Sequence, residues 1–92
     1  MNTLHIYAQT FWHDEAYIAG TQEALQYLRD AIDYALKDGI GSAQSFVKDG
    51  EGYWIQVVET DAETMDKMRV PYTDDIAKPR EGDNFGPWDL IK

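Results

Sequence analysis

The chain has 92 residues, no cysteine and a formal net charge of −9, so it forms one domain without disulfides or thiolate metal sites. Its acidity disfavours nucleic acid and anionic membranes as direct partners and favours a protein partner with a basic surface. The sequence has no signal peptide and no run of about 20 apolar residues, which predicts a cytoplasmic protein without membrane contact.

Two short strands come first in the chain. Leu4–Gln9 alternates apolar and polar residues with the period of two that a half-buried strand shows. Ala16–Ala19 predicts a second strand, which Gly20 ends. The short loop between them is polar and aromatic, so the two strands are expected to form a hairpin.

The strongest pattern predicts a helix over Gln22–Lys37. Thr21 can accept a hydrogen bond from a free amide at its start, and Gly39 can take the left-handed conformation that stops it. Tyr27 and Tyr34 flank its apolar stripe and either seal the edge of the helix–sheet interface or belong to a protein-binding patch. The stripe, which recurs every three or four residues and should face the core, consists of Ala24, Leu25, Leu28, Ala31, Ile32, Ala35 and Leu36.

The second half of the chain predicts another hairpin and a short helix. Ser42–Val47 is weakly patterned and typical of an edge strand, whereas Tyr53–Glu59 is rich in aromatic and β-branched residues. Asp49-Gly50 between them is a dipeptide common in tight hairpin turns. Thr60–Glu63 has the spacing of a capping box and predicts a helix that continues through Met68.

This order predicts an α+β fold of the ββαββ type. One amphipathic helix would pack on a four-stranded, mainly antiparallel sheet, followed by a short second helix. Residues 1–70 would form the α+β core domain. Residues 71–92 contain all three prolines and several large apolar side chains, which predicts an ordered, irregular tail packed on that core.

No group of residues predicts catalysis or metal binding. His13-Asp14-Glu15 is the one suggestive cluster, but three adjacent side chains cannot converge on one ion, and a polar hairpin loop explains them. Asp49–Gly52 lacks the distal glutamate of a calcium loop. Neither Ser42 nor Ser45 lies in a nucleophile elbow. We therefore expect no enzyme activity, no cofactor and no metal.

Carboxylates and exposed aromatic residues together predict a protein-binding surface. Aromatic side chains anchor protein interfaces, and carboxylates select basic partners. The candidate binding residues are Trp12, His13, Asp14, Glu15, Tyr17, Asp30, Asp33, Asp49, Glu51 and Trp54.

The sequence also resembles a group of known proteins. The matching segments are Leu4–Ala8, His13–Ile18, Glu23–Leu25, Leu28–Asp33 and Asp49–Tyr53. They resemble small uncharacterised proteins of bacteria and their phages, over about two thirds of the chain. Its size, acidity and lack of an active site are also similar to those of phage inhibitors of bacterial defence systems, anti-CRISPR proteins among them. The resemblance implies no catalytic residues.

These observations predict a non-enzymatic protein-binding module. Its role would be that of an inhibitor or neutralising protein, of the phage anti-defence or immunity type, which occludes a basic or nucleic-acid-handling partner. The alternative is a protein that binds or sequesters a nucleotide-like small molecule between the loop Phe11–Glu15 and the tail. The sequence leaves the oligomeric state open, with a homodimer as one option.

Overall fold

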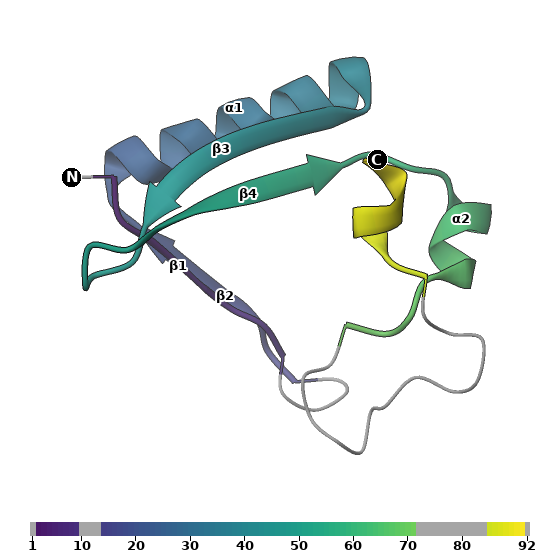
Figure 1. Ribbon diagram of the computed structural model, residues 1–92, viewed down its shortest axis with the longest axis horizontal. Coiled ribbons are helices and arrows are strands. Elements are labelled where there is room, and N and C mark those ends of the chain that lie inside the picture. Colours follow the sequence, from purple (N-terminus) through teal and green to yellow (C-terminus); the bar gives the residue numbers. More distant parts are fainter. Residues whose placement is uncertain (1, 10–13, 72–84, 92) are drawn as a thin grey trace. The chain divides into compact units, whose positions relative to one another are not determined.

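The computed structural model describes residues 2–9, 14–71 and 85–91 of the chain (Figure 1). The chain divides into two compact units, Met1–Ile6 with Ile18–Glu59 and Tyr7–Tyr17 with Thr60–Lys92. The elements follow the order strand, strand, helix, strand, strand, and then a short helix and a 3-10 helix. This order confirms the predicted α+β class.

Helix α1 of the first unit spans Gln22–Asp38. Its start is capped by Thr21, whose side-chain oxygen accepts a hydrogen bond from the Ala24 N–H at 3.2 Å. Its end is set by Gly39, which has a φ of 95° and donates its N–H to the Ala35 carbonyl at 2.8 Å. Both termini therefore lie where the capping residues of the sequence predicted them.

Strands β3 (Ile40–Phe46) and β4 (Gly52–Val58) form an antiparallel hairpin directly after α1. At its turn the Val47 N–H donates to the Glu51 carbonyl at 2.9 Å, which leaves a three-residue loop. Gly50 ends this loop with a φ of 93°, a conformation that favours glycine. The predicted turn is thereby confirmed.

Strands β1 (Leu4–Tyr7) and β2 (Tyr17–Gly20) pair with each other in a second sheet. The prediction of one four-stranded sheet is therefore confirmed only in part: the four strands are present, but they form two separate sheets of two strands. One parallel bridge between Thr3 and Phe46 joins their edges. This bridge lies at the last residue of β3, and no described pair of residues extends it into a ladder along that strand.

The core of the first unit lies between α1 and β3, which run side by side (Figure 1). The two backbones approach so closely at Gly41 that a Cβ atom there would lie 1.9 Å from the Ala31 carbonyl oxygen. The helix face turned to the strand is accordingly made of alanines. The buried apolar residues are Leu4, Ala24, Ala31, Ala35 and Ala43.

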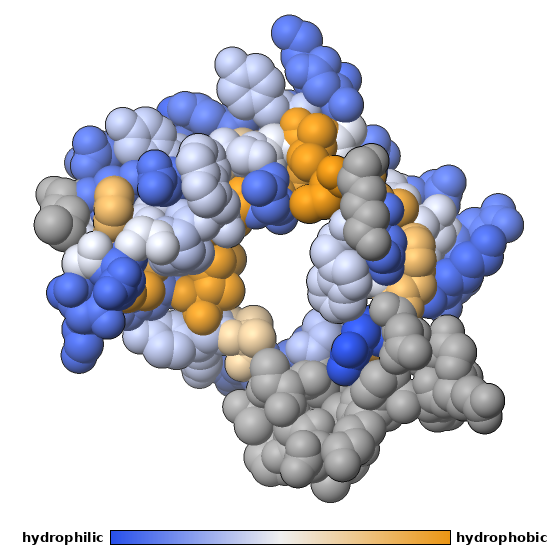
Figure 2. Space-filling model, in the orientation of Figure 1, coloured by the Kyte–Doolittle hydropathy of each residue, from blue (hydrophilic) through white to orange (hydrophobic). Residues whose placement is uncertain are grey.

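The large residues of the predicted apolar stripe are only partly buried. Leu25 and Ile32 are each 42% exposed and Leu36 is 70% exposed. Apolar surface is visible near the end of α1 and the start of β3 (Figure 2). The two-stranded β3–β4 sheet is narrower than the apolar stripe of α1. Among the described residues it covers the alanines of the stripe, and one flank of the helix stays exposed.

The second unit contains helix α2 (Ala62–Lys67) and the 3-10 helix η2 (Pro87–Leu90). The Asp61 carboxylate caps α2 by accepting the Thr64 N–H at 2.8 Å, so the predicted cap at Thr60 is wrong by one residue. Hydrogen bonds from Thr64 lower the pKa of Asp61. Residues 72–84, most of the predicted tail, lie outside the described residues.

Candidate functional site

The hydrogen bonds of the β3–β4 hairpin determine which backbone groups of β3 remain free. The Glu59 N–H donates to the Gly39 carbonyl at 3.0 Å, and the Val47 N–H donates to the Glu51 carbonyl. Bonded pairs alternate along an antiparallel ladder, so residues 41, 43 and 45 bond to β4. Residues 40, 42, 44 and 46 therefore direct their N–H and C=O groups to the opposite edge.

Asn2 occupies one end of this outer edge. Its carbonyl accepts the Phe46 N–H at 3.0 Å, and its side-chain amide donates to the Gln44 carbonyl at 2.6 Å. The fully buried Ser45 hydroxyl donates to the Asn2 Oδ1 at 2.6 Å. Further along this edge, the outward N–H and C=O of Ser42 form no hydrogen bond with any described residue.

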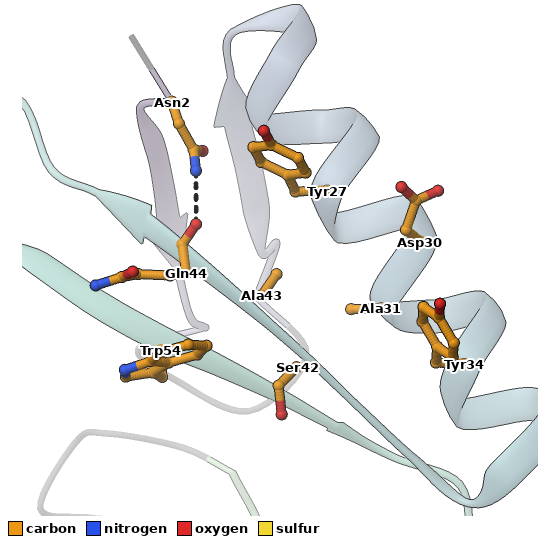
Figure 3. Close-up of a pocket in the computed structure, with 9 residues that line it drawn as sticks. All are labelled: Asn2, Tyr27, Asp30, Ala31, Tyr34, Ser42, Ala43, Gln44 and Trp54. Atoms are coloured by element: carbon orange, nitrogen blue, oxygen red, sulfur yellow. Dashed lines mark hydrogen bonds between the residues drawn. The ribbon is translucent and has the colours of Figure 1, made fainter.

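A groove of about 480 Å³ follows this free edge (Figure 3). One wall comes from α1 and carries two tyrosines and a carboxylate. The other wall comes from the face of the β3–β4 sheet that points away from α1. The lining residues are Tyr27, Asp30 and Tyr34 on the helix wall, Ser42, Gln44 and Trp54 on the sheet wall, Ala31 and Ala43 between them, and Asn2 at one end.

The aromatic residues of the groove are exposed and a carboxylate lies between two of them. Tyr27 is 45% exposed, Tyr34 is 58% exposed and Trp54 is 61% exposed. Asp30 follows Tyr27 by three residues and precedes Tyr34 by four, so the three share one flank of α1. Its ion pair with Arg29, at 3.5 Å between largely exposed side chains, is weak and leaves the carboxylate accessible.

The edge of β3 lacks the features that usually protect a free strand. Natural proteins shield such edges with lysines, prolines or bulges, since unpaired backbone groups can form hydrogen bonds with a strand of another chain. The segment Ile40–Phe46 has no charged residue and no proline. Most of its side chains are small, so they leave the backbone accessible. The groove can therefore offer hydrogen-bond donors and acceptors, aromatic surface and one negative charge.

Two of the predicted binding residues, Asp30 and Trp54, line this groove. Asp33 is exposed on α1 but does not line it. Asp49 and Glu51 belong to the β3–β4 turn, where the Asp49 carboxylate accepts the Glu51 N–H at 2.9 Å. Their roles there are those of turn residues.

Three further predicted residues lie in the second unit. Tyr17 donates its hydroxyl hydrogen bond to the Glu15 carboxylate, and Asp14 accepts the Glu15 N–H at 3.0 Å. The hydrogen bond to Glu15 is the main cause that raises the pKa of the Tyr17 hydroxyl. Trp12 and His13 lie outside the described residues, as does much of the small-molecule pocket predicted between the Phe11–Glu15 loop and the tail.

Sequence reasoning did not assign Asn2, Ser42 and Gln44 to the site, and it left the role of Tyr27 and Tyr34 open. Ser42 and Gln44 contribute mainly backbone groups, which no side-chain pattern reveals. The available signal was an edge strand without charge or proline beside two tyrosines spaced by two helical turns.

A smaller cavity of about 320 Å³ lies in the second unit. Its lining is mostly apolar, with one cationic side chain, and it consists of Arg69, Val70, Pro71, Pro87 and Trp88. It offers no acid–base pair. The described parts of the chain also contain no group of three histidine or carboxylate side chains placed to hold a metal ion.

Within the described ranges, no helix is both long enough and apolar enough to cross a membrane. Comparisons with protein-family models, with curated proteins and with solved structures gave no match for this chain. Its function therefore has to be inferred from the groove and its surroundings.

Proposed function

We propose that this protein is a non-enzymatic, acidic protein-binding module. It acts as an inhibitor or neutralising protein, of the phage anti-defence or immunity type, which covers the surface of a basic or nucleic-acid-handling partner. The observation that carries this proposal is the groove between α1 and the free edge of β3, with its exposed tyrosines, tryptophan and carboxylate.

The aromatic lining supports a protein partner. Tyrosine and tryptophan supply much of the energy of protein interfaces, because they bury large areas at a small loss of conformational freedom. Tyr27, Tyr34 and Trp54 are each close to half exposed or more, so a partner can cover surface that water now contacts.

The charge supports a basic partner. A net charge of −9 on 92 residues gives a field that accelerates association with a cationic surface and opposes association with nucleic acid. Such an acidic surface can take the place of nucleic acid on the partner. We expect the association rate to fall as salt concentration rises.

A small-molecule ligand is the second candidate, because the groove volume lies within the range of about 300–1,000 Å³ that such sites have. The exposure of its walls favours a protein. Small-ligand sites bury about 70–90% of their ligand, whereas Tyr34 and Trp54 remain more than half exposed on the two sides of this groove.

A photo-crosslinking experiment tests the proposal. The photoreactive residue p-benzoylphenylalanine would replace Tyr34 in one variant and Gln26 in another, because Gln26 is exposed on α1 but does not line the groove. We expect a protein from a bacterial host lysate to crosslink through position 34 only, with a yield that falls at high salt. Equal capture from both positions, or recovery of a small molecule alone, would refute the proposal.

A further inference from the structure

We propose that the free edge of β3 takes up an extended segment of the basic partner by strand addition. We further propose that Asp30, flanked by Tyr27 and Tyr34, selects a lysine or arginine side chain of that segment. This inference rests on the proposed function and specifies how the partner is held.

The backbone of β3 supplies the first part of the argument. Ile40, Ser42 and Gln44 direct their N–H groups to the outer edge, whereas Asn2 already occupies the Phe46 N–H and the Gln44 carbonyl. The edge that remains, from residue 40 to residue 44, is about 15 Å long at the rise of a β-strand. It can pair with roughly four or five residues of an added strand, whose main-chain hydrogen bonds give affinity.

The two walls supply the second part. Successive side chains of a strand point to opposite faces, so those of an added strand would alternate between the α1 wall and the Trp54 wall (Figure 3). The Trp54 wall offers an exposed indole ring for an apolar side chain. The α1 wall offers a carboxylate between two aromatic rings, so the side chain that it accepts must differ in chemistry from the apolar one on the Trp54 wall.

The α1 wall fits a cation. A lysine or arginine placed between Tyr27 and Tyr34 contacts aromatic faces and the Asp30 carboxylate together, and both contacts favour positive charge. Among the residues that the structure describes, Arg29 is the one cation that pairs with Asp30, and this contact at 3.5 Å is solvent-exposed and therefore easily exchanged.

Charge also decides between this occupant and a second copy of the chain. Pairing of β3 with β3 of another copy would bring two Asp30-bearing walls together, and each copy carries a charge of −9. A basic segment meets the same surface with attraction instead of repulsion.

The test uses the full chain and a random library of short peptides displayed on phage. We expect enriched peptides to carry a lysine or arginine within a run of β-branched residues. N-methylation of the peptide backbone should abolish binding at alternate positions only, since only every second amide faces β3. The amide resonances of Ser42 and Gln44 should shift on binding.

Matched variants test the selectivity. Asp30→Asn should weaken binding of the selected peptide by about 3–10-fold and remove its preference for lysine over norleucine. Asp33→Asn removes the same charge outside the groove and should change the affinity by less than about twofold. Equal losses from these two variants would overturn the role of Asp30.

Several outcomes would overturn strand addition itself. They are the lack of any enriched peptide, N-methylation effects without alternation, and a concentration-dependent dimer whose interface contains Ser42. If crosslinking through position 34 succeeds while peptide binding fails, the proposed function stands and only this binding mode is refuted. If peptides bind and crosslinking captures no protein, the inhibitor function is refuted.

Discussion

Substitution of Gly41 by alanine should destabilise the protein more than its single added methyl group suggests. The new Cβ would lie 1.9 Å from the Ala31 carbonyl oxygen, 2.7 Å from its carbonyl carbon and 3.0 Å from its Cα. All three atoms belong to the helix backbone, so no side-chain rotation relieves the contact and α1 must move away from β3. Overpacking of this kind costs about 1–3 kcal/mol, and we expect a value near the upper end.

The effect is large for a chain of this size. A domain of 92 residues is stabilised by roughly 5–14 kcal/mol, and each kcal/mol lost lowers Tm by about 4–8 °C. We therefore expect Gly41→Ala to lower Tm by about 8–20 °C, measured by circular dichroism, with a matching shift of the urea midpoint.

Gly50→Ala is the matched control. Apart from its two chain neighbours, no atom of the described residues lies within 4 Å of a Cβ at Gly50, so the strain comes from its φ of 93° and costs about 1–2 kcal/mol. If Gly41→Ala is no less stable than Gly50→Ala, α1 and β3 do not approach as closely as described, and the groove between them is not defined by this contact.

Further predictions concern the core, the register and pH. Leu4→Ala should cost about 2–5 kcal/mol in chemical denaturation because Leu4 is 0% exposed, whereas Leu36→Ala, at 70% exposure, should cost under about 0.5 kcal/mol. Ser42→Pro should leave Tm nearly unchanged, because the Ser42 N–H points away from β4, yet it should abolish peptide binding. Ala43→Pro should unfold the hairpin, because the Ala43 N–H bonds to β4. Similar Tm values for these two variants would refute the register. The lowered pKa of Asp61 means that its ionised carboxylate stabilises α2 at neutral pH and that this stabilisation is lost as pH falls through the lowered pKa. Asp61→Ala should therefore reduce the helicity of α2 at neutral pH, measured by NMR, and an unchanged α2 in this variant would contradict the cap.

The helix termini could be predicted from the sequence because their causes are local. Thr21 and Gly39 act on backbone groups within four residues of themselves, so a single chain carries the whole signal. The β3–β4 turn at Gly50 is local in the same way.

Strand pairing could not be predicted because it depends on distant contacts. Nothing in the pattern of Leu4–Gln9 indicates that the residues before it join β3, through the bridge from Thr3 to Phe46 and the hydrogen bonds of Asn2. The outer edge of β3 is free because β3 forms a ladder with β4 alone among the described strands. The groove along this edge therefore could not be predicted before the strand pairing was known. The aromatic and acidic character of the site was predicted, through Asp30 and Trp54, whereas its backbone component at Ser42 was not.

The close succession of α1, β3 and β4 has a consequence for folding. Only Gly39 separates the helix from β3, and a three-residue loop separates the two strands, so these elements meet at a small cost in loop-closure entropy. The contact of Asn2 with Ser45 spans 43 residues and has to close a far longer loop. We therefore expect the segment Gln22–Val58 to form first, as the folding nucleus. Both walls of the groove belong to that segment, so the binding surface is assembled before the N-terminal strand joins it.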